Sequence, residues 1–333
     1  MKKISVLVPL VAISLTACSL GKHHNISEYI LDRSLTLNEK GEFKILQLTD
    51  IHLGDKDNQD LHFKFMDLTV KDANPDFIVV TGDVFTFAGK ATAQRLFGWL
   101  DSKGVPWTVT WGNHDEQCYF SVDWMTGYLN SMGSNCYFKD IQDDDIQGNS
   151  NFAINLNDKD GKLFEQLIIM DSNRYDFNPS HGLYYDAFKP NQIQWYCDLV
   201  DYTAKTPNAY LNGNNVVESL MFYHIPLPEI NDAYEANKAA LDGVKNEDTC
   251  PPDYNTGFFA KIKEKGSTHA MFYGHDHIND FIADYQGVKF AYGVKATSSI
   301  YSNDDLLGGQ TITIKADHSL QIDRIFHTYA EVK

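Results

Sequence analysis

Five short polar signatures, each placed directly after a short apolar run, constrain this chain more than any other feature. Short apolar runs bounded by polar residues are typical of buried strands. Ligands of α/β proteins bind outside the carboxyl ends of strands, so we expect all five signatures to lie on one edge of one sheet. In chain order the signatures are Asp50-Ile51-His52, Gly82-Asp83, Gly112-Asn113-His114-Asp115, His224 and Gly274-His275-Asp276-His277.

The side chains in these signatures are those that bind hard or borderline divalent cations. They supply imidazole, carboxylate and amide groups and no thiolate, which suits a pair of such metals. A lone histidine such as His224 is more often structural, but its place after the apolar run 220–223 favours a ligand. The remaining histidines of the body fit no signature and are predicted to be structural: His62, His181, His269, His318 and His327.

The alternation of strand and helix patterns from Phe43 onward predicts an α/β fold. Helical patterns at 61–70 and 91–100 separate the first three strand runs, which implies parallel strands with right-handed crossovers. Another helix is predicted at 191–200, just after Pro190. Further strands are predicted at 151–156 and 166–170, and beyond Tyr273 at 280–285, 288–292, 310–314 and 320–325, the last four in a second sheet packed on the first.

The charge balance bears on the partners of the protein. The 333 residues include 28 Lys and Arg against 45 Asp and Glu, a net charge of -17. Such a surface repels polyanions, so we expect no nucleic-acid partner. The length is ample for a full hydrophobic core, and no linker divides the body into two domains.

The N-terminus has the pattern of a targeting segment. Lys2 and Lys3 precede a short apolar stretch at 6–15, and Leu15-Thr16-Ala17-Cys18 resembles a bacterial lipobox. We therefore expect residues 1–17 to be a signal peptide, Cys18 to carry lipid that anchors the protein to a membrane, and residues 18–40 to be a tether. The alternative is an ordinary secretory signal. Both place the mature protein outside the cytoplasm.

Four further cysteines leave two alternatives open. Outside the cytoplasm an even number of cysteines can form two disulfides, and four free thiols are the other possibility. None lies in a CxxC pair, so a structural zinc site is not expected. The four are Cys118, Cys136, Cys197 and Cys250.

The order D-x-H, GD, GNHD, H and GHxH resembles the signatures of the calcineurin-like metallophosphoesterase superfamily, over residues 43–277. The resemblance implies a metallo-dependent phosphatase fold over residues 41–333, with two packed mixed β-sheets flanked by helices in a four-layer sandwich. It also implies a hydrolase that acts on phosphate esters.

The resemblance further implies two divalent metal ions as cofactors, with Mn, Fe, Zn or Ni all suited to the site. Two cations roughly 3.5–4 Å apart can clamp a phosphoryl group and generate a hydroxide near neutral pH. The first ion would be bound by Asp50, His52 and His277, the second by Asn113, His224 and His275, and both by Asp83.

Two residues next to the ligands would act on the substrate. By the same resemblance, His114 is not a ligand but faces the substrate and stabilises or protonates the leaving oxygen. Asp115 would orient His114, as carboxylates commonly orient catalytic imidazoles. Asp276, between two ligand histidines, is expected to have a supporting role.

A narrower resemblance points to the purple-acid-phosphatase-like branch, through residues 107–116, 224–229 and 274–280. Purple acid phosphatases carry a Tyr ligand three residues after the bridging Asp, where this chain has Thr86, and they usually lack the His that is present here as His52. An iron–tyrosinate centre is therefore not expected.

The resemblance favours a phosphomonoesterase acting on a small phosphorylated substrate. A phosphodiesterase of the same fold, acting on cyclic nucleotides or phospholipid head groups, is an alternative, because the same two-metal core serves both. Others are a non-catalytic surface binding lipoprotein and a phosphate-scavenging receptor. Arg174 is a candidate phosphate contact, and Tyr184, Tyr185, Pro226 and Tyr254 are candidates for the cleft wall.

Overall fold

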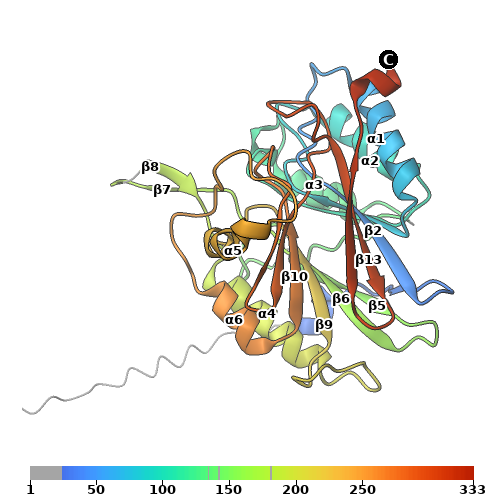
Figure 1. Ribbon diagram of the computed structural model, residues 1–333, viewed down its shortest axis with the longest axis vertical. Helices are drawn as coiled ribbons and strands as arrows, with labels where there is room; N and C mark the ends of the chain where they lie inside the picture. The colour runs from blue at the N-terminus through green and yellow to red at the C-terminus, as the bar shows by residue number, and fades with distance from the viewer. Residues whose placement is uncertain (1–24, 134, 142, 181) are drawn as a thin grey trace, which may run out of the picture.

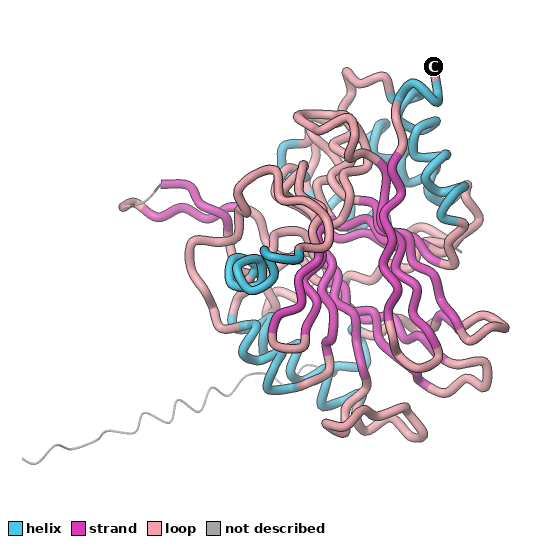
Figure 2. Tube along the Cα trace, in the orientation of Figure 1, coloured by secondary structure: helices cyan, strands magenta, loops and turns pink. Residues whose placement is uncertain are grey.

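Two mixed β-sheets packed face to face form the centre of the molecule, in a computed structural model that describes residues 25–333 except 134, 142 and 181 (Figures 1 and 2). One sheet has five strands in the order β14-β13-β2-β3-β4. Its strands are β2 (Glu42–Leu48), β3 (Phe77–Thr81), β4 (Trp107–Thr110), β13 (Gly308–Lys315) and β14 (Leu320–Phe326).

The other sheet has seven strands in the order β1-β5-β6-β9-β10-β12-β11. A separate two-stranded ribbon, β7 (Tyr175–Asn178) and β8 (Gly182–Tyr185), projects from the body (Figure 1). The seven strands are β1 (Leu35–Thr36), β5 (Phe152–Asn157), β6 (Leu163–Ile169), β9 (Glu218–Phe222), β10 (Thr268–Tyr273), β11 (Ile282–Tyr285) and β12 (Val288–Tyr292).

Helices cover the outer faces of both sheets (Figure 1). On the five-stranded side lie α1 (Gln59–Ala73), α2 (Lys90–Asp101) and α3 (Val122–Asn130), and on the other side α4 (Pro190–Thr203), α5 (Ile230–Asn237) and α6 (Phe258–Lys265). The four-layer phosphatase fold is thus confirmed. The predicted helices at 61–70, 91–100 and 191–200 are α1, α2 and α4.

Alternation along the strands builds two apolar layers from one sheet. On β9, Leu220 and Phe222 belong to the core between the sheets, whereas Met221 belongs to the second buried cluster, which includes Trp195 of α4. This period of two follows from the opposite directions of successive side chains in a strand. Burying each such side chain stabilises the fold by roughly 1.5–3 kcal/mol.

The prediction that one sheet carries all five signatures is wrong. The first three follow β2, β3 and β4 of the five-stranded sheet, and the last two follow β9 and β10 of the seven-stranded sheet. The later strands were also misplaced: β11 and β12 extend the sheet of β10, and β13 inserts antiparallel beside β2. Local pattern predicts strands but carries no information on their partners, which long-range packing selects.

The described part of the predicted tether is docked on the body. Residues Ile26–Tyr29 form a 3₁₀ turn, and β1 pairs in parallel with β5, with Leu35 opposite Leu156. The buried side chains of Ile26, Tyr29 and Leu35 hold this segment. The predicted signal peptide 1–17 and Cys18 lie outside the described residues. No helix of the described residues is long and apolar enough to cross a bilayer.

The four cysteines of the body are free thiols in the structure, which is the second of the two alternatives. Cys136 and Cys197 are buried, and Cys118 and Cys250 are half-buried. Burial raises the pKa of Cys136 to about 12, so its thiol is protonated at neutral pH and packs as a small apolar group.

Candidate metal centre

The polar signatures form tight turns with unusual backbone angles. Asp50, His52, Asp83 and His275 have φ values of 52°, 47°, 46° and 84°, in the left-handed region that residues with a side chain rarely adopt. Each such residue costs of order 1 kcal/mol or more and persists only where its surroundings hold it. Backbone bonds do so here: the amide of His52 donates to the carbonyl of Asp83 at 2.9 Å.

The glycines of the signatures allow the turns to approach the ligand side chains. A Cβ atom on Gly82 would lie 2.5 Å from Cγ of His224, and one on Gly274 would lie 1.9 Å from Oγ1 of Thr49. Contacts under 3 Å are not tolerated without movement. Only glycine fits at these two positions, because the backbone passes so close to other side chains. The sequence shows that glycine recurs in the signatures but does not show this reason.

The first group of candidate ligands comes from both sheets. Asp50, His52, Asp83 and His277 are buried, and each offers one ligand atom within 4.8 Å of the others. The Nε2 atoms of His52 and His277 lie 2.9 Å apart, and Nε2 of His52 lies 3.5 Å from Oδ2 of Asp83. Separations of this size are those of atoms that share one cation.

The second group shares Asp83 with the first and adds His224 and His275. Nε2 of His224 lies 3.2 Å from Oδ2 of Asp83. Several buried polar atoms here make no hydrogen bond: Oδ2 of Asp83, Oδ1 of Asn113, Nε2 of His224 and both ring nitrogens of His275. Buried polar atoms are rarely left without a partner, so this donor set fits a second cation. The structure thus groups six of the seven predicted ligands, and Oδ1 of the seventh, Asn113, is buried without a hydrogen-bond partner.

Hydrogen bonds fix which ring nitrogen of His52, His224 and His277 faces the centre. Nδ1 of His224 donates to the carbonyl of Thr81 at 2.8 Å, and Nδ1 of His277 donates to the carbonyl of Tyr301 at 3.0 Å. Nδ1 of His52 pairs with the hydroxyl of Thr86 at 2.7 Å. Each bond leaves Nε2 with its lone pair directed at the centre, as metal-binding imidazoles require.

Burial and charge set the protonation of the ligands. Burial, and then the charge of His224, lowers the pKa of His275 to about 3. Burial alone would raise the pKa of Asp83, but the neighbouring histidines outweigh it and hold that pKa low. Burial alone would lower the pKa of His224, yet Asp83 raises it to about 9. A cation must therefore displace a proton from His224, so acid weakens metal binding.

Asp115 does not orient His114, contrary to the prediction. The carboxylate of Asp115 accepts from the backbone amides of Phe85 at 2.9 Å and Gly112 at 2.8 Å and is fully buried. Nδ1 of His114 pairs instead with Oε1 of Gln117 at 2.8 Å. Burial, and then the charge of Asp83, raises the pKa of Asp115 to about 7. Asp115 therefore links the loop after β3 to the loop after β4 from a buried position.

Three residues of the site were not marked by any motif. The hydroxyl of Tyr175 accepts from Nδ2 of Asn113 at 2.7 Å, which directs Oδ1 of Asn113 elsewhere. Nζ of the buried Lys295 donates to the carbonyl of Asp50 at 2.7 Å. Tyr301 stacks on His277 with ring centroids 4.2 Å apart. No sequence motif could have identified these residues, because each lies outside the motif of the candidate ligand that it contacts and meets it only in the folded structure.

Of the softer candidates, Tyr185 contacts a candidate ligand, whereas Arg174 pairs with acidic side chains of the protein. The ring of Tyr185 meets that of His275 edge to face at 4.4 Å. Arg174 is nearly buried and pairs with Glu116 at 3.2 Å and Asp171 at 3.5 Å. Its charge is therefore already balanced within the protein.

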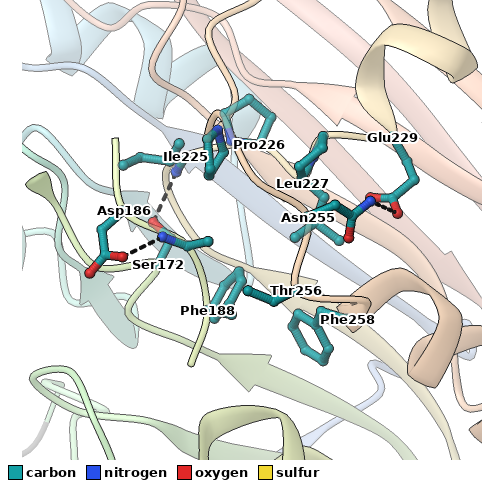
Figure 3. A pocket seen from close by; sticks show the side chains of 13 residues that line it. Ser172, Asp186, Phe188, Ile225, Pro226, Leu227, Glu229, Asn255, Thr256 and Phe258 are labelled. Atoms are coloured by element: carbon teal, nitrogen blue, oxygen red, sulfur yellow. Dashed lines mark hydrogen bonds between the residues drawn. The ribbon is translucent and has the colours of Figure 1, made fainter. Parts of the chain in front are cut away.

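A small cavity follows His224 along the chain (Figure 3). Its volume of about 10 Å³ suits one water molecule and excludes a substrate. The amide of Ile225 donates to Oγ of Ser172 at 2.9 Å at its edge, which fixes the backbone next to His224. Its lining includes Ser172, Asp186, Ile225, Pro226, Glu229 and Phe258.

Comparison with known proteins agrees with this geometry. A family model described as calcineurin-like phosphoesterase matches residues 43–279. "Probable inactive purple acid phosphatase 14" of Arabidopsis thaliana is 29% identical over 289 residues, which cover 78% of this chain and 72% of the relative. "Phosphatase DCR2" of Saccharomyces cerevisiae is 26% identical over 276 residues, 73% of this chain and 45% of that protein. The crystal structure of a dimetal phosphatase from Danio rerio shares the fold, with a TM-score of 0.53 and 13% identity over 85% of this chain and 98% of its own.

Proposed function

The chain belongs to the calcineurin-like phosphoesterase family of hydrolases that act on phosphate esters, and we propose that it is a dinuclear phosphomonoesterase. One observation carries the dinuclear part of the proposal. Two groups of buried ligand atoms share the carboxylate of Asp83, and their unpartnered atoms lie where two cations would be bound. The similarity to proteins named phosphatases supports the monoester over the diester.

Two divalent cations in this donor set would supply Lewis-acid polarisation of the phosphoryl oxygens and activation of water. Asp50, His52 and His277 would hold one, and Asn113, His224 and His275 the other. Asp83 would serve both, because its Oδ2 lies 3.5 Å from Nε2 of His52 in one group and 3.2 Å from Nε2 of His224 in the other. The geometry leaves the metal identity open among Mn, Fe, Zn and Ni.

His114 is the proposed proton donor to the leaving oxygen. Its ring lies 4.9 Å from that of His52, and its amide donates to Oδ1 of Asp83 at 2.8 Å, so it lies against the metal centre without being a ligand. Nδ1 of His114 donates to Oε1 of Gln117, which leaves Nε2 as the nitrogen for the substrate. Positioned general acids of this kind contribute about 10²- to 10⁴-fold in rate.

A non-catalytic role is the competing proposal. Three Arabidopsis thaliana relatives carry the words "Probable inactive" in their names, which describe those proteins. In this chain all seven ligand positions and His114 hold side chains able to do the chemistry. A binding module has no need of a strained, unpartnered ligand set, so we favour catalysis.

The test is metal-dependent turnover. The purified protein would be stripped of metal, reloaded with each candidate metal, and assayed with p-nitrophenyl phosphate and bis-p-nitrophenyl phosphate. We expect two metals per chain, preference for the monoester, and loss of turnover in Asp83→Asn. Asp72→Asn, which alters an exposed carboxylate of α1, is the matched control. Preference for the diester would make the protein a phosphodiesterase, and binding of two metals without turnover would favour the non-catalytic module.

We also propose that the protein works outside the cytoplasm, anchored through lipid on Cys18. The support is the pattern of the first 18 residues. Replacement of Cys18 by Ser is expected to release the protein from the membrane fraction of the producing cell, as fractionation would show.

A further inference from the structure

The ribbon of β7 and β8 has one apolar face. Its antiparallel register places Tyr175 opposite Tyr185 and Phe177 opposite Leu183. Side chains two residues apart share a face, so these four form one continuous surface, which we call the apolar strip. The stacked rings of Tyr175 and Tyr185, 5.5 Å apart, agree with this assignment.

The opposite face of the ribbon is polar and tied to the body. Asp176 lies 3.5 Å from Nζ of Lys189, and Tyr184 meets Tyr254 edge to face at 5.8 Å. Lys189 also donates to the hydroxyl of Tyr254 at 3.2 Å. The ribbon is thus held through one face, and the apolar strip remains available for a ligand.

The inner end of the apolar strip is part of the metal centre. Tyr175 accepts the hydrogen bond from Asn113, and Tyr185 contacts the ring of His275. Both partners are proposed ligands of the second metal. A phosphate held there would therefore lie beside the first pair of the strip.

The outer end of the apolar strip is uncovered in the structure. Phe177 is 65% exposed and Leu183 is 66% exposed, although they are cross-strand neighbours on the same face of the ribbon. Figure 1 shows the ribbon projecting away from the sheets. A contiguous exposed apolar surface that begins at a catalytic centre is typical of a binding surface. Phe177 lies two residues after Tyr175, so the apolar strip extends about 7 Å outward from Tyr175 along the strand.

We propose that the apolar strip binds the alcohol portion of the substrate, which makes phosphate monoesters of long alkyl or extended aromatic alcohols the substrate class. This inference rests on the proposed phosphatase function. The phosphate would lie at the metal centre, and the apolar chain would run outward over Tyr175 and Tyr185 to Phe177 and Leu183. The stacked rings supply flat apolar area at the start of the path, and the exposed pair extends it.

The test compares n-octyl phosphate with n-butyl phosphate, both below micelle-forming concentrations. We expect kcat/KM to be about tenfold higher for the octyl ester, from partial burial of four extra methylenes. In the double variant Phe177→Ser/Leu183→Ser that ratio should fall to about twofold. The matched control is Tyr202→Ser/Leu211→Ser, which removes two exposed side chains of similar size away from the ribbon and should keep the wild-type ratio.

Binding of n-octylphosphonate and n-butylphosphonate, measured by calorimetry on the metal-loaded protein, separates this inference from the proposed function. Turnover of both esters at equal kcat/KM would overturn the apolar strip and leave the phosphatase intact. Absence of turnover with a retained octyl preference in binding would overturn the phosphatase and leave the strip. A double variant that changes the oligomeric state in sedimentation but not the octyl preference would assign the strip to contact between copies, and would overturn the inference.

Discussion

Thr86 contacts the candidate metal ligand His52. Thr86 stands where the purple acid phosphatases have their Tyr, and its hydroxyl lies 2.7 Å from Nδ1 of His52, the histidine that those enzymes usually lack. We predict that Thr86→Val leaves His52 without this partner and lowers metal affinity about tenfold or more. Metal titration of the apoprotein measures it.

The control for this prediction is Thr92→Val in α2, which removes a hydroxyl that donates to Oδ1 of Asp55 at 2.7 Å. Its metal affinity should match that of the wild type. If Thr86→Val bound both metals as tightly as the wild type, His52 would be oriented by packing alone.

Replacement of glycine by alanine is expected to have opposite effects on the free energy of unfolding at Gly274 and at Gly98. A Cβ on Gly274 would meet Thr49 and Asp50 at 1.9 and 2.4 Å, so Gly274→Ala must displace the turn that carries His275. A Cβ on the exposed Gly98 of α2 meets nothing within 4 Å, and Gly98→Ala should raise the free energy of unfolding by about 0.5–1 kcal/mol.

Denaturant unfolding of the metal-free variants measures these changes. We expect Gly274→Ala to lower the free energy of unfolding by roughly 1–3 kcal/mol, as overpacking does. Equal stability of Gly274→Ala and the wild type would show that the turn moves at no cost.

At the scale of elements, a bulge in β10 creates a pH-dependent contact. The register between β9 and β10 shifts between Thr268 and Ala270, which turns His269 toward Glu165 of β6, at 2.7 Å. Burial lowers the pKa of His269, but the hydrogen bond and charge of Glu165, with Glu218, outweigh it and raise that pKa above 6.5. The charged pair therefore stabilises the fold fully below pH 6.5, and the stabilisation is lost as pH rises through the folded-state pKa.

We predict that His269→Gln destabilises the metal-free protein by roughly 1–2 kcal/mol at pH 5.5 and by less at pH 9. The nearby charges of Lys289, Glu218 and His318 remain in both proteins and cancel in the comparison. Denaturant midpoints at the two pH values provide the measurement. A cost that is larger at pH 9 would contradict the assigned direction of the pKa shift.

The same elements show what local sequence can and cannot predict. Amphipathic helices and apolar strands follow from patterns within a few residues, so α1, α2, α4 and the strands before the signatures were predicted. The bulge at His269, the insertion of β13 beside β2 and the apolar strip of the ribbon depend on which strands meet, and that choice is made by packing over the whole chain.

At the scale of the whole molecule, the grouping of the candidate ligands was predictable, and the residues that support them were not. The seven predicted ligands lie in short motifs, and the residue types in these motifs indicate metal binding. Tyr175 and Lys295 contact Asn113 and Asp50 from distant parts of the chain, and no spacing in the sequence connects these pairs. The hydrogen bonds of Asp115 were equally unpredictable from the sequence, because its partners are backbone amides, which any residue except proline could supply.

Because the ligands come from both sheets, bound cations should tie the two layers together. Asp50, His52 and Asp83 follow strands of the five-stranded sheet, whereas His224 and His275 follow strands of the other. At a hundredfold excess over its dissociation constant, each cation stabilises the folded state by about 2.7 kcal/mol. We predict that a chelator lowers the Tm of the wild type, and that Asp83→Asn, which lacks the shared carboxylate, loses most of this response while Asp72→Asn keeps it. If two metals bind to each wild-type chain but the Tm does not change, the unfolded chain must bind them equally well, and the two sheets are held by their apolar core alone.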